Sequence, residues 1–248
     1  MEAETLLLFI SLAFVAEILG TIGGFGSSLF FVPLAGFFFD FHSVLGITAL
    51  FHIISNLTKI GFFRKGIDKK LIFTIGIPSA VLVIPGAYLS KYIDSNILEF
   101  SLGLFLILLS IFLIIFRNIN IKPTLFNAIT GGSVSGFIAG LIGTGGAIRG
   151  AMLSAYNIKM EIFIATSALI DLAIDSSRAV IYSLNGFVHK HDIYLIPYLL
   201  AASITGTLLG KKILQKISEE RFKLIVLILV LITGIFTLLN FIYNDFFK

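Results

Sequence analysis

The chain contains no cysteine, which excludes disulfide bonds and thiolate metal sites. Charged residues make up only 13% of its 248 residues, whereas 57% are hydrophobic and 26 are phenylalanine. A soluble domain of this size needs a far more polar surface to cover its core. The shortage of charge and the strongly positive mean hydropathy therefore indicate an integral membrane protein.

The chain also lacks the residue patterns of hydrolytic and metal-dependent enzymes. It has no HExxH motif, no candidate Ser-His-Asp arrangement and no Gly-Lys-Ser/Thr ending of a phosphate loop. The net charge of +4 comes mainly from basic residues in short connectors, which orient helices in a bilayer and do not indicate nucleic-acid binding. We therefore expect no enzyme activity, no metal, no cofactor and no nucleic-acid partner, and a lipid bilayer as the surroundings.

Apolar runs long enough to cross a bilayer as helices recur along the whole chain. They lie at residues 43–63, 71–93, 97–116, 162–184, 193–210 and 222–243. About 20 helical residues span the hydrocarbon core, and continuous hydrophobicity distinguishes such helices from membrane β-strands. The predicted fold class is an all-α, multi-pass membrane protein without a soluble domain. A further run at 5–22 is expected to belong to the fold and not to a removable signal peptide.

The sequence repeats itself with a spacing of 119 or 120 residues. The glycine-rich segment GTIGGFG at 20–26 matches GLIGTGG at 140–146, and TALFHIISNLTKIGFF at 48–63 runs parallel to SALIDLAIDSSRAVIY at 167–182. We therefore predict two homologous halves, residues 1–120 and 121–248. Each half is expected to hold about four spanning helices and one broken or re-entrant glycine-rich helix.

The relative direction of the halves depends on whether segments 5–40 and 124–157 cross the bilayer once or turn back at their glycines. If they turn back, the halves are inverted, and twelve of fifteen Lys and Arg residues at the helix ends lie on one side. If they cross once, the same residues divide eight to seven. Because cytoplasmic loops collect basic residues, we predict inverted repeats with the N-terminus outside and RKGIDKK, residues 64–70, inside.

Both glycine-rich segments interrupt apolar runs, and non-helical backbone at membrane depth is tolerated only where it is buried or lines a cavity. Close helix packing is the alternative explanation of these glycines. A helix that starts after such a break presents free N–H groups, which suit an anion. We expect Gly23 and Gly143 to tolerate no bulk. The predicted substrate-binding residues of these segments are Gly23, Gly24, Gly26, Ser27, Ser28, Gly143, Thr144, Gly145 and Gly146.

Three basic side chains within the apolar segments are candidates for contacting an anion: Lys59, Arg149 and Arg178. Lys59 and Arg178 occupy equivalent positions in the two halves. Arg149 follows the second glycine cluster and either faces the protein interior or extends to the membrane surface. Asn56 lies one turn before Lys59 on the same helical face and is predicted to share in substrate binding.

Four further side chains are predicted to carry a coupling proton: His52, Asp171, Asp175 and Glu17. Asp171 and Asp175 share one face of their helix with Arg178. An internal ion pair of Asp175 with Arg178 is the structural alternative, but two stacked carboxylates exceed what one arginine can neutralise. A proton on Asp171 would couple to anion movement. Glu17 is either a second proton site or a side chain that only reaches for water.

The twofold unit, the segments GTIGGFGSSLFFVP at 20–33 and GLIGTGGAIRGAML at 140–153, and the polar helix after each resemble the sulfite exporter TauE/SafE family, also called toluene sulfonate uptake permeases. The resemblance covers residues 6 to about 239. It implies secondary transport of small sulfur-containing anions or organic carboxylates across a prokaryotic inner membrane.

Together these observations predict a proton-coupled permease or exporter for a small anion such as sulfite, a sulfonate or a carboxylate. Its site is expected near the bilayer midplane between the two halves. An anion channel and a non-transporting scaffold or sensor are the alternatives. The repeated helix breaks and the duplicated cations favour transport over a scaffold, and a homo-oligomer is compatible with the sequence.

Overall fold

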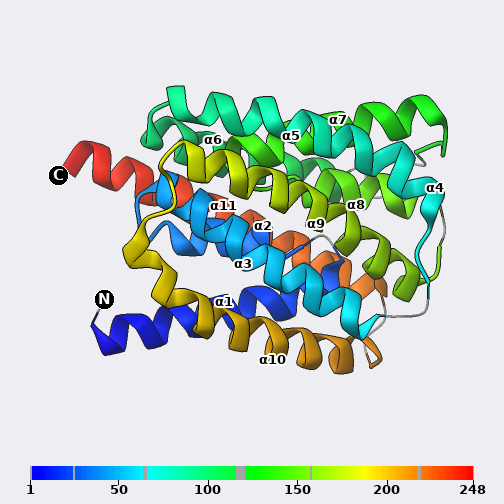
Figure 1. Ribbon diagram of the computed structural model, residues 1–248, viewed down its shortest axis with the longest axis horizontal. Helices are drawn as coiled ribbons and strands as arrows, with labels where there is room; N and C mark the ends of the chain where they lie inside the picture. The colour runs from blue at the N-terminus through cyan, green and yellow to red at the C-terminus, as the bar shows by residue number, and fades with distance from the viewer. Residues whose placement is uncertain are drawn as a thin grey trace.

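The computed structural model describes residues 2–24, 26–63, 66–115, 121–156, 158–216 and 219–247, and the regular secondary structure of this part of the chain is helical, without a β-strand (Figure 1). The α-helices are α1 (Ala3–Gly23), α2 (Ser28–Ala35), α3 (Phe41–Phe62), α4 (Lys69–Leu71), α5 (Ile77–Leu89), α6 (Ser95–Ile115), α7 (Leu125–Ile142), α8 (Gly146–Ser154), α9 (Met160–Leu184), α10 (Ile196–Leu214) and α11 (Glu219–Phe247). A π-helical turn (Ile72–Gly76) joins α4 to α5, and 3-10 turns follow α5 (Ser90–Tyr92) and precede α10 (Lys190–Leu195). The all-α prediction is confirmed.

Most of the long helices have the length and composition of membrane spans. Among the described residues, six segments qualify on both counts: Ala3–Gly23, Phe41–Phe62, Lys69–Tyr92, Ser95–Ile115, Leu125–Ile142 and Asp192–Leu214. The 25-residue helix α9 is long enough, but it carries Asp171, Asp175 and Arg178 at its centre. The chain is therefore a multi-pass membrane protein in which one central helix is unusually polar.

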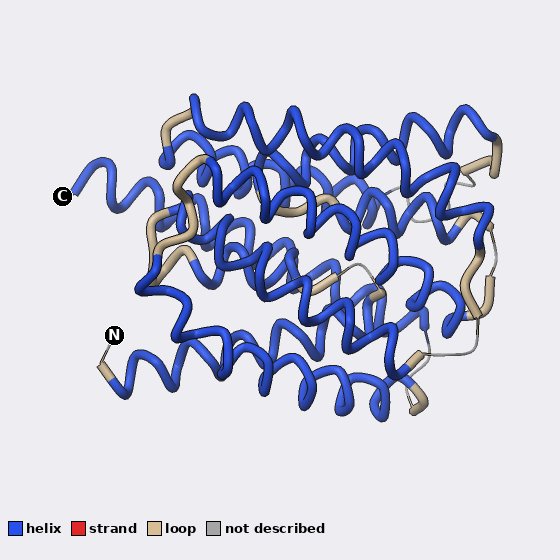
Figure 2. Tube along the Cα trace, in the orientation of Figure 1, coloured by secondary structure: helices blue, strands red, loops and turns tan. Residues whose placement is uncertain are grey.

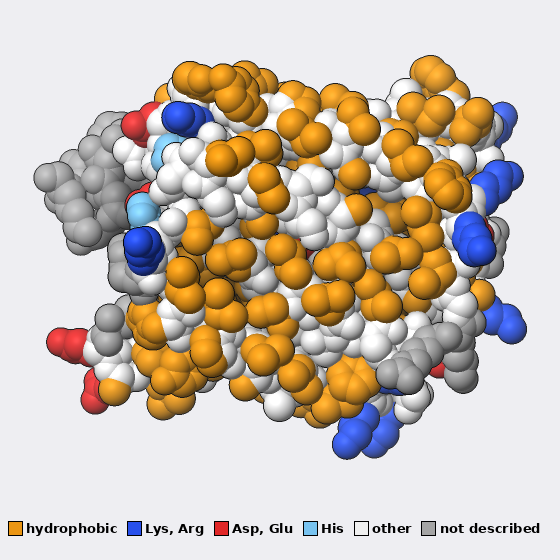
Figure 3. Space-filling model, viewed as in Figure 1, with side chains coloured by type: hydrophobic (Ala, Val, Ile, Leu, Met, Phe, Trp, Pro, Cys, Tyr) orange, Lys and Arg blue, Asp and Glu red, His pale blue; other side chains and the backbone are white. Residues whose placement is uncertain are grey.

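The outer surface of the bundle is apolar. Large side chains such as Phe73, Phe100 and Phe126 are exposed there, and Figure 3 shows hydrophobic side chains covering most of the face between the two ends of the bundle. Lys and Arg side chains gather along the right-hand edge in this view, whereas acidic, basic and histidine side chains are mixed at the left-hand edge. This distribution suits a molecule whose sides contact lipid and whose ends contact water.

Two helices are broken at glycine. The residue after α1 is Gly24 with φ 68°, and the residue after α7 is Gly143 with φ 81°, both in the left-handed region that favours glycine. In each case the glycine N–H donates back to a carbonyl four residues earlier, on Gly20 and Ala139 respectively. The backbone therefore pairs Gly143 with Gly24, and the expected pairing of Gly143 with Gly23 is wrong. Gly23 is the last residue of α1.

The helices of the first half pack against helices of the second half. α3 lies against α9 in the middle of the bundle, α1 packs on α10 at one side, and α5 packs on α7 at the other (Figure 1). α6 packs on α11. Small residues permit the close approach: a Cβ at Gly206 of α10 would lie 2.9 Å from Cβ of Glu17 on α1. Loops lie at both ends of the bundle and, at the two helix breaks, inside it (Figure 2).

Candidate functional site

A buried cavity lies where α3, α9 and both helix breaks meet. Most of the predicted site residues line it: Gly26, Ser27, Ser28, His52, Asn56, Lys59, Gly143, Gly145, Gly146, Arg149, Asp171, Asp175 and Arg178. Ser55, Ala139 and Ile174 complete the lining. Among the predicted residues, Gly23, Gly24, Thr144 and Glu17 do not line this central cavity.

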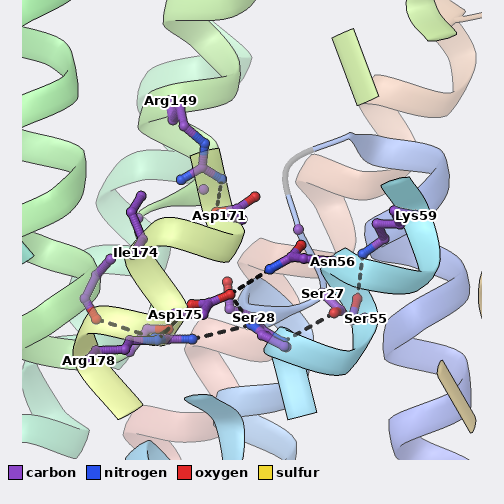
Figure 4. Close-up of a pocket in the computed structure, with 16 residues that line it drawn as sticks. Ser27, Ser28, Ser55, Asn56, Lys59, Arg149, Asp171, Ile174, Asp175 and Arg178 are labelled. Carbon is purple, nitrogen blue, oxygen red and sulfur yellow. Dashed lines mark hydrogen bonds and ion pairs between the residues drawn. The ribbon is translucent and has the colours of Figure 1, made fainter. Parts of the chain in front are cut away.

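Asp175 takes part in polar contacts that join the two halves. Its Oδ1 lies 2.8 Å from Nε of Arg178, three residues further along α9. Its Oδ2 accepts a hydrogen bond of 2.7 Å from Nδ2 of Asn56 on α3 (Figure 4). The internal ion pair considered as a structural alternative is therefore present. It does not remove Asp175 or Arg178 from the cavity, which both side chains line.

Arg178 also holds the second helix break in place. Its Nη1 donates a 2.6 Å hydrogen bond to the carbonyl of Gly143, the residue whose left-handed backbone ends α7. One turn later on α9, the Tyr182 hydroxyl donates a 2.6 Å bond to the carbonyl of Gly140. Carbonyls at a helix C-terminus lack intrahelical partners, so these two side chains satisfy groups that the break leaves free.

His52 connects this cluster to the first helix break. Nη2 of Arg178 lies 3.2 Å from Nδ1 of His52, and Nε2 of His52 lies 3.2 Å from Oγ of Ser27. Arginine only donates, so Nδ1 accepts and the ring proton is assigned to Nε2. Ser27 in turn donates a 2.8 Å bond to Glu17. A directional chain of hydrogen bonds therefore runs from Arg178 of the second half to Glu17 of the first.

Glu17 is fully buried, and the expectation that it reaches for water is wrong. Its carboxylate lies 2.9 Å from Nζ of Lys59. The hydroxyls of Ser27, Ser55 and Thr207 lie 2.8 to 2.9 Å from its oxygens. Sequence reasoning missed Ser55 and Thr207. Ser55 lies four residues before Lys59 on α3, which is a usable signal, but Thr207 lies on α10 and has no such signal.

Arg149 points into the protein and does not extend to the membrane surface. Its side chain is 1% exposed, and Nη2 lies 2.5 Å from Oδ1 of Asp171. The second carboxylate, which Arg178 alone cannot neutralise, therefore has an arginine of its own from α8. Oγ of Ser167, one turn earlier on α9, lies 3.4 Å from the other oxygen of Asp171.

The charges around the central cavity are balanced in pairs. Lys59 faces Glu17, Arg149 faces Asp171, and Arg178 faces Asp175. Three cations thus meet three carboxylates, so the set as a whole carries no excess of positive charge when all six groups are ionised. Each cation therefore has a carboxylate that a bound anion would have to share or replace.

The two helix breaks touch each other next to the cavity. Oγ of Ser28, the first residue of α2, lies 3.2 Å from Oγ1 of Thr144 in the second break. The second break is tied back to α7 by Ser135, whose hydroxyl donates a 2.7 Å bond to the carbonyl of Gly145. The starts of α2 and α8 therefore lie at the same cavity, although they are 118 residues apart.

A second cavity adjoins the first. The two share four lining residues: Gly26, Asn56, Lys59 and Asp171. The rest of its lining is Gly20, Gly24, Ile164, Ser167 and Ala168. The second cavity thus extends from the central cavity along the first part of α9, toward the end of that helix that begins after Lys159.

Comparison with known proteins gives two matches of the same kind. The sulfite exporter TauE/SafE family matches residues 9–237 of the chain. The chain is also similar to a protein of Methanocaldococcus jannaschii named "Probable membrane transporter protein MJ0441", with 30% identity over 265 residues that cover 96% of this chain and 98% of the relative. No solved structure matches the chain.

Proposed function

The chain belongs to the sulfite exporter TauE/SafE family and is a membrane transporter, and we propose that it is a proton-coupled secondary transporter of small sulfur-containing anions. Sulfite and organosulfonates are the expected substrates, and a small carboxylate has the same charge chemistry. The bilayer it crosses is proposed to be the inner membrane of a prokaryotic cell. The proposed substrate site is the central cavity.

The observation that carries this proposal is the convergence of Arg149 and two helix starts on one buried cavity. The N-termini of α2 and α8 present backbone N–H groups of the kind that bind anions in broken-helix transporters. Arg149 adds a guanidinium that is 1% exposed. Its Nε has no hydrogen-bond partner among the described residues. A buried donor without a partner is unfavourable, and an anion in the cavity would provide one.

The balance of charges supports coupling to protons. Three cations and three carboxylates already surround the site, so an anion that enters alone leaves a buried region with net negative charge, which is costly in a medium of low dielectric constant. A proton on one carboxylate restores neutrality. Asp171, Asp175, Glu17 and His52 remain the proposed proton sites. The chain of hydrogen bonds from Arg178 to Glu17 includes His52 and Glu17, and the ion pair of Arg178 with Asp175 links a third site to it.

The proposal is tested by uptake into liposomes that contain the purified protein. We expect at least one of sulfite, thiosulfate, methanesulfonate and acetate to enter saturably, faster when the outside is more acidic than the inside, and to stop when a protonophore removes the gradient. The matched control is Ser176→Ala, a change at an exposed position of α9, which should leave uptake unchanged. Flux that does not saturate would indicate a channel, and no flux of any of the four anions would contradict transport of this class.

We further propose that the two halves are inverted repeats with both chain ends outside. In Figure 1 the pair α1 and α2 begins and ends toward the N-terminal side of the bundle, whereas α7 and α8 begin and end at the opposite side. The helix packing supports a symmetry that relates the two halves. At a spacing of about 120 residues α1 corresponds to α7 and α5 to α10, and the contact of α1 with α10 corresponds to that of α7 with α5.

Reporter fusions provide the measurement of this topology. Fusions after Lys70 and Lys216 are expected to report the cytoplasmic side, and a fusion after Lys190 the outer side, because the basic connectors then face the cytoplasm. An outer location after Lys216 would contradict inverted halves, whatever the protein transports.

A further inference from the structure

Asp171 differs from the other two carboxylates of the site in its position. It lines both the central cavity and the second cavity, whereas Asp175 lines only the central one and Glu17 lines neither. Its side chain is 16% exposed, compared with 5% for Asp175 and 0% for Glu17. Asp171 is therefore the carboxylate of the three that solvent reaches most easily.

Arg149 is the least constrained of the three cations. Lys59 is held by Glu17 and Ser55, at 2.9 and 2.8 Å. Arg178 contacts Asp175 and also bonds to a backbone carbonyl at 2.6 Å. For Arg149, Asp171 is the side-chain partner in the described structure, and Nε is buried without one. Of the three cations, Arg149 therefore loses the fewest existing contacts when it exchanges its carboxylate partner for another anion.

The Arg149 and Asp171 side chains meet across the boundary between the cavities. Arg149 extends from α8 into the central cavity, and Asp171 meets it from α9 (Figure 4). The other charged and polar groups around Asp171 are Asn56 and Lys59 of α3, which line the same two cavities, and Ser167, Asp175 and Arg178 of α9. The ion pair therefore lies where the two spaces adjoin.

We propose that the Arg149–Asp171 ion pair is a gate between the two cavities, and that the transported anion opens it by taking the place of Asp171 on Arg149. Asp171 then acts as a built-in competitor of the substrate, and a proton on Asp171 favours the open gate because a neutral carboxyl binds arginine more weakly. Only the identity of the competing anion rests on the proposed function. The position of the gate rests on the two cavities and the ion pair.

The gate faces the end of the bundle that carries the basic connectors. The second cavity is lined by Ile164, Ser167 and Ala168 in the first part of α9, and α9 begins at Met160, directly after Lys159. An anion that passes the gate would therefore exchange with the side that holds Lys69, Lys70 and Lys159, whose charges attract it.

The absence of cysteine from the chain makes a direct accessibility test possible. Ser167→Cys places one thiol in the second cavity, and Ser28→Cys places one in the central cavity. The probe is 2-sulfonatoethyl methanethiosulfonate, a membrane-impermeant sulfonate that modifies thiols, applied to inside-out vesicles and to intact cells. Rates are normalised to those of thiols introduced at exposed ends of the bundle, at Lys70 for the basic side and at Lys91 for the opposite side.

We expect the thiol at position 167 to react from the basic side and the thiol at position 28 to react slowly from that side. Adding Asp171→Asn, which mimics the protonated carboxyl, should raise the rate at position 28 at least about tenfold, equivalent to about 1.4 kcal/mol in the gate equilibrium. Asp175→Asn is the matched control, because Asp175 does not line the second cavity, and it should not raise that rate. For the trimethylammonioethyl reagent, a cation of similar size, Asp171→Asn should raise the reaction rate at position 28 much less.

An unchanged rate at position 28 after Asp171→Asn, with the thiol at position 167 still reactive, would overturn the gate. Equal reactivity of both thiols in the chain that retains Asp171 would overturn it as well. A variant that fails to fold is recognised by loss of the reaction pattern at position 167. These outcomes do not depend on transport, so failure of the gate and failure of the proposed function are distinguishable: the latter shows only as absent anion uptake.

Discussion

Replacing Lys59 by methionine is expected to lower the free energy of unfolding by about 3–5 kcal/mol, the cost of leaving a buried charge without its partner. Glu17 is fully buried and lies 2.9 Å from Nζ of Lys59. Methionine retains much of the length of the lysine stem but removes the ammonium group. The hydroxyls of Ser27, Ser55 and Thr207 would still surround the carboxylate, but they do not replace a full positive charge. SDS titration of the protein in mixed micelles measures the loss.

The double variant Lys59→Met with Glu17→Gln distinguishes a broken ion pair from a simple packing defect. Both charges are then absent, and the glutamine amide can still accept bonds from the surrounding hydroxyls, so most of the lost stability should return. Lys122→Met, in an exposed connector, is the control and should change stability by less than about 0.5 kcal/mol. A double variant that is no more stable than Lys59→Met alone would contradict this account.

The same pair of variants separates stability from transport. Lys59 lines both cavities and is a predicted substrate-binding residue, so the double variant should fold but take up anions slowly. If uptake returns together with stability, Lys59 serves the fold alone. Because the two measurements are made on the same protein, a loss of folded protein cannot be mistaken for a loss of substrate binding.

The helices and their breaks could be predicted because they depend on local sequence. Apolar runs of about 20 residues indicate membrane helices without knowledge of their neighbours. The i, i+4, i+7 spacing of Asp171, Asp175 and Arg178 places them on one face of α9. All three line the central cavity. The repeat predicted that Lys59 and Asn56 occupy the corresponding face of α3, and these two residues line it as well.

The pairing of charges could not be predicted, because it depends on how each broken helix turns back. Lys59 and Glu17 lie 42 positions apart, and Arg149 reaches Asp171 only because α8 packs beside α9. Sequence spacing offered Arg178 as the single arginine for both aspartates, and Glu17 as a side chain without a partner. A cation within helical reach is visible in a sequence, whereas a partner on another helix is visible only in the fold.

The register of the first helix break was also beyond the sequence. Gly23 and Gly24 are adjacent, and either one can adopt the left-handed conformation that ends a helix. Matching the heptapeptides by their glycines favoured Gly23 as the equivalent of Gly143. The backbone shows the left-handed residue at Gly24, so the structural repeat at the break has the 119-residue spacing of α3 and α9 and not that of the glycine pattern.

Replacing Arg149 by glutamine is expected to reduce anion uptake by roughly tenfold to hundredfold, which corresponds to the loss of one charge-assisted contact of about 1.5–3 kcal/mol. Arg149 lines the central cavity, and its Nε has no hydrogen-bond partner among the described residues. The first half offers no substitute, because the equivalent position at the 119-residue spacing holds Phe30, a buried core residue. The initial rate of uptake into liposomes, with the anion identified from the four tested, gives the measurement.

The single variant leaves Asp171 without its cation, so the decisive comparison is with Arg149→Gln combined with Asp171→Asn. That pair of changes removes one positive and one negative charge together, and should restore thermal stability close to that of the unmodified protein. Uptake should remain low, because no guanidinium is left to bind the anion. Arg149→Lys keeps the charge but not the forked donor geometry, and is expected to give an intermediate rate.

The stability and uptake of this double variant separate the two roles of Arg149. Normal stability with low uptake assigns the guanidinium to the substrate, whereas normal stability with normal uptake reduces Arg149 to a partner that neutralises a buried aspartate. Uptake by Asp171→Asn alone completes the set: with Arg149 present and its competitor neutral, the anion should enter with a weaker dependence on the pH gradient. If Asp171→Asn retains the full dependence on the pH gradient, the coupling proton binds another carboxylate of the site and not Asp171.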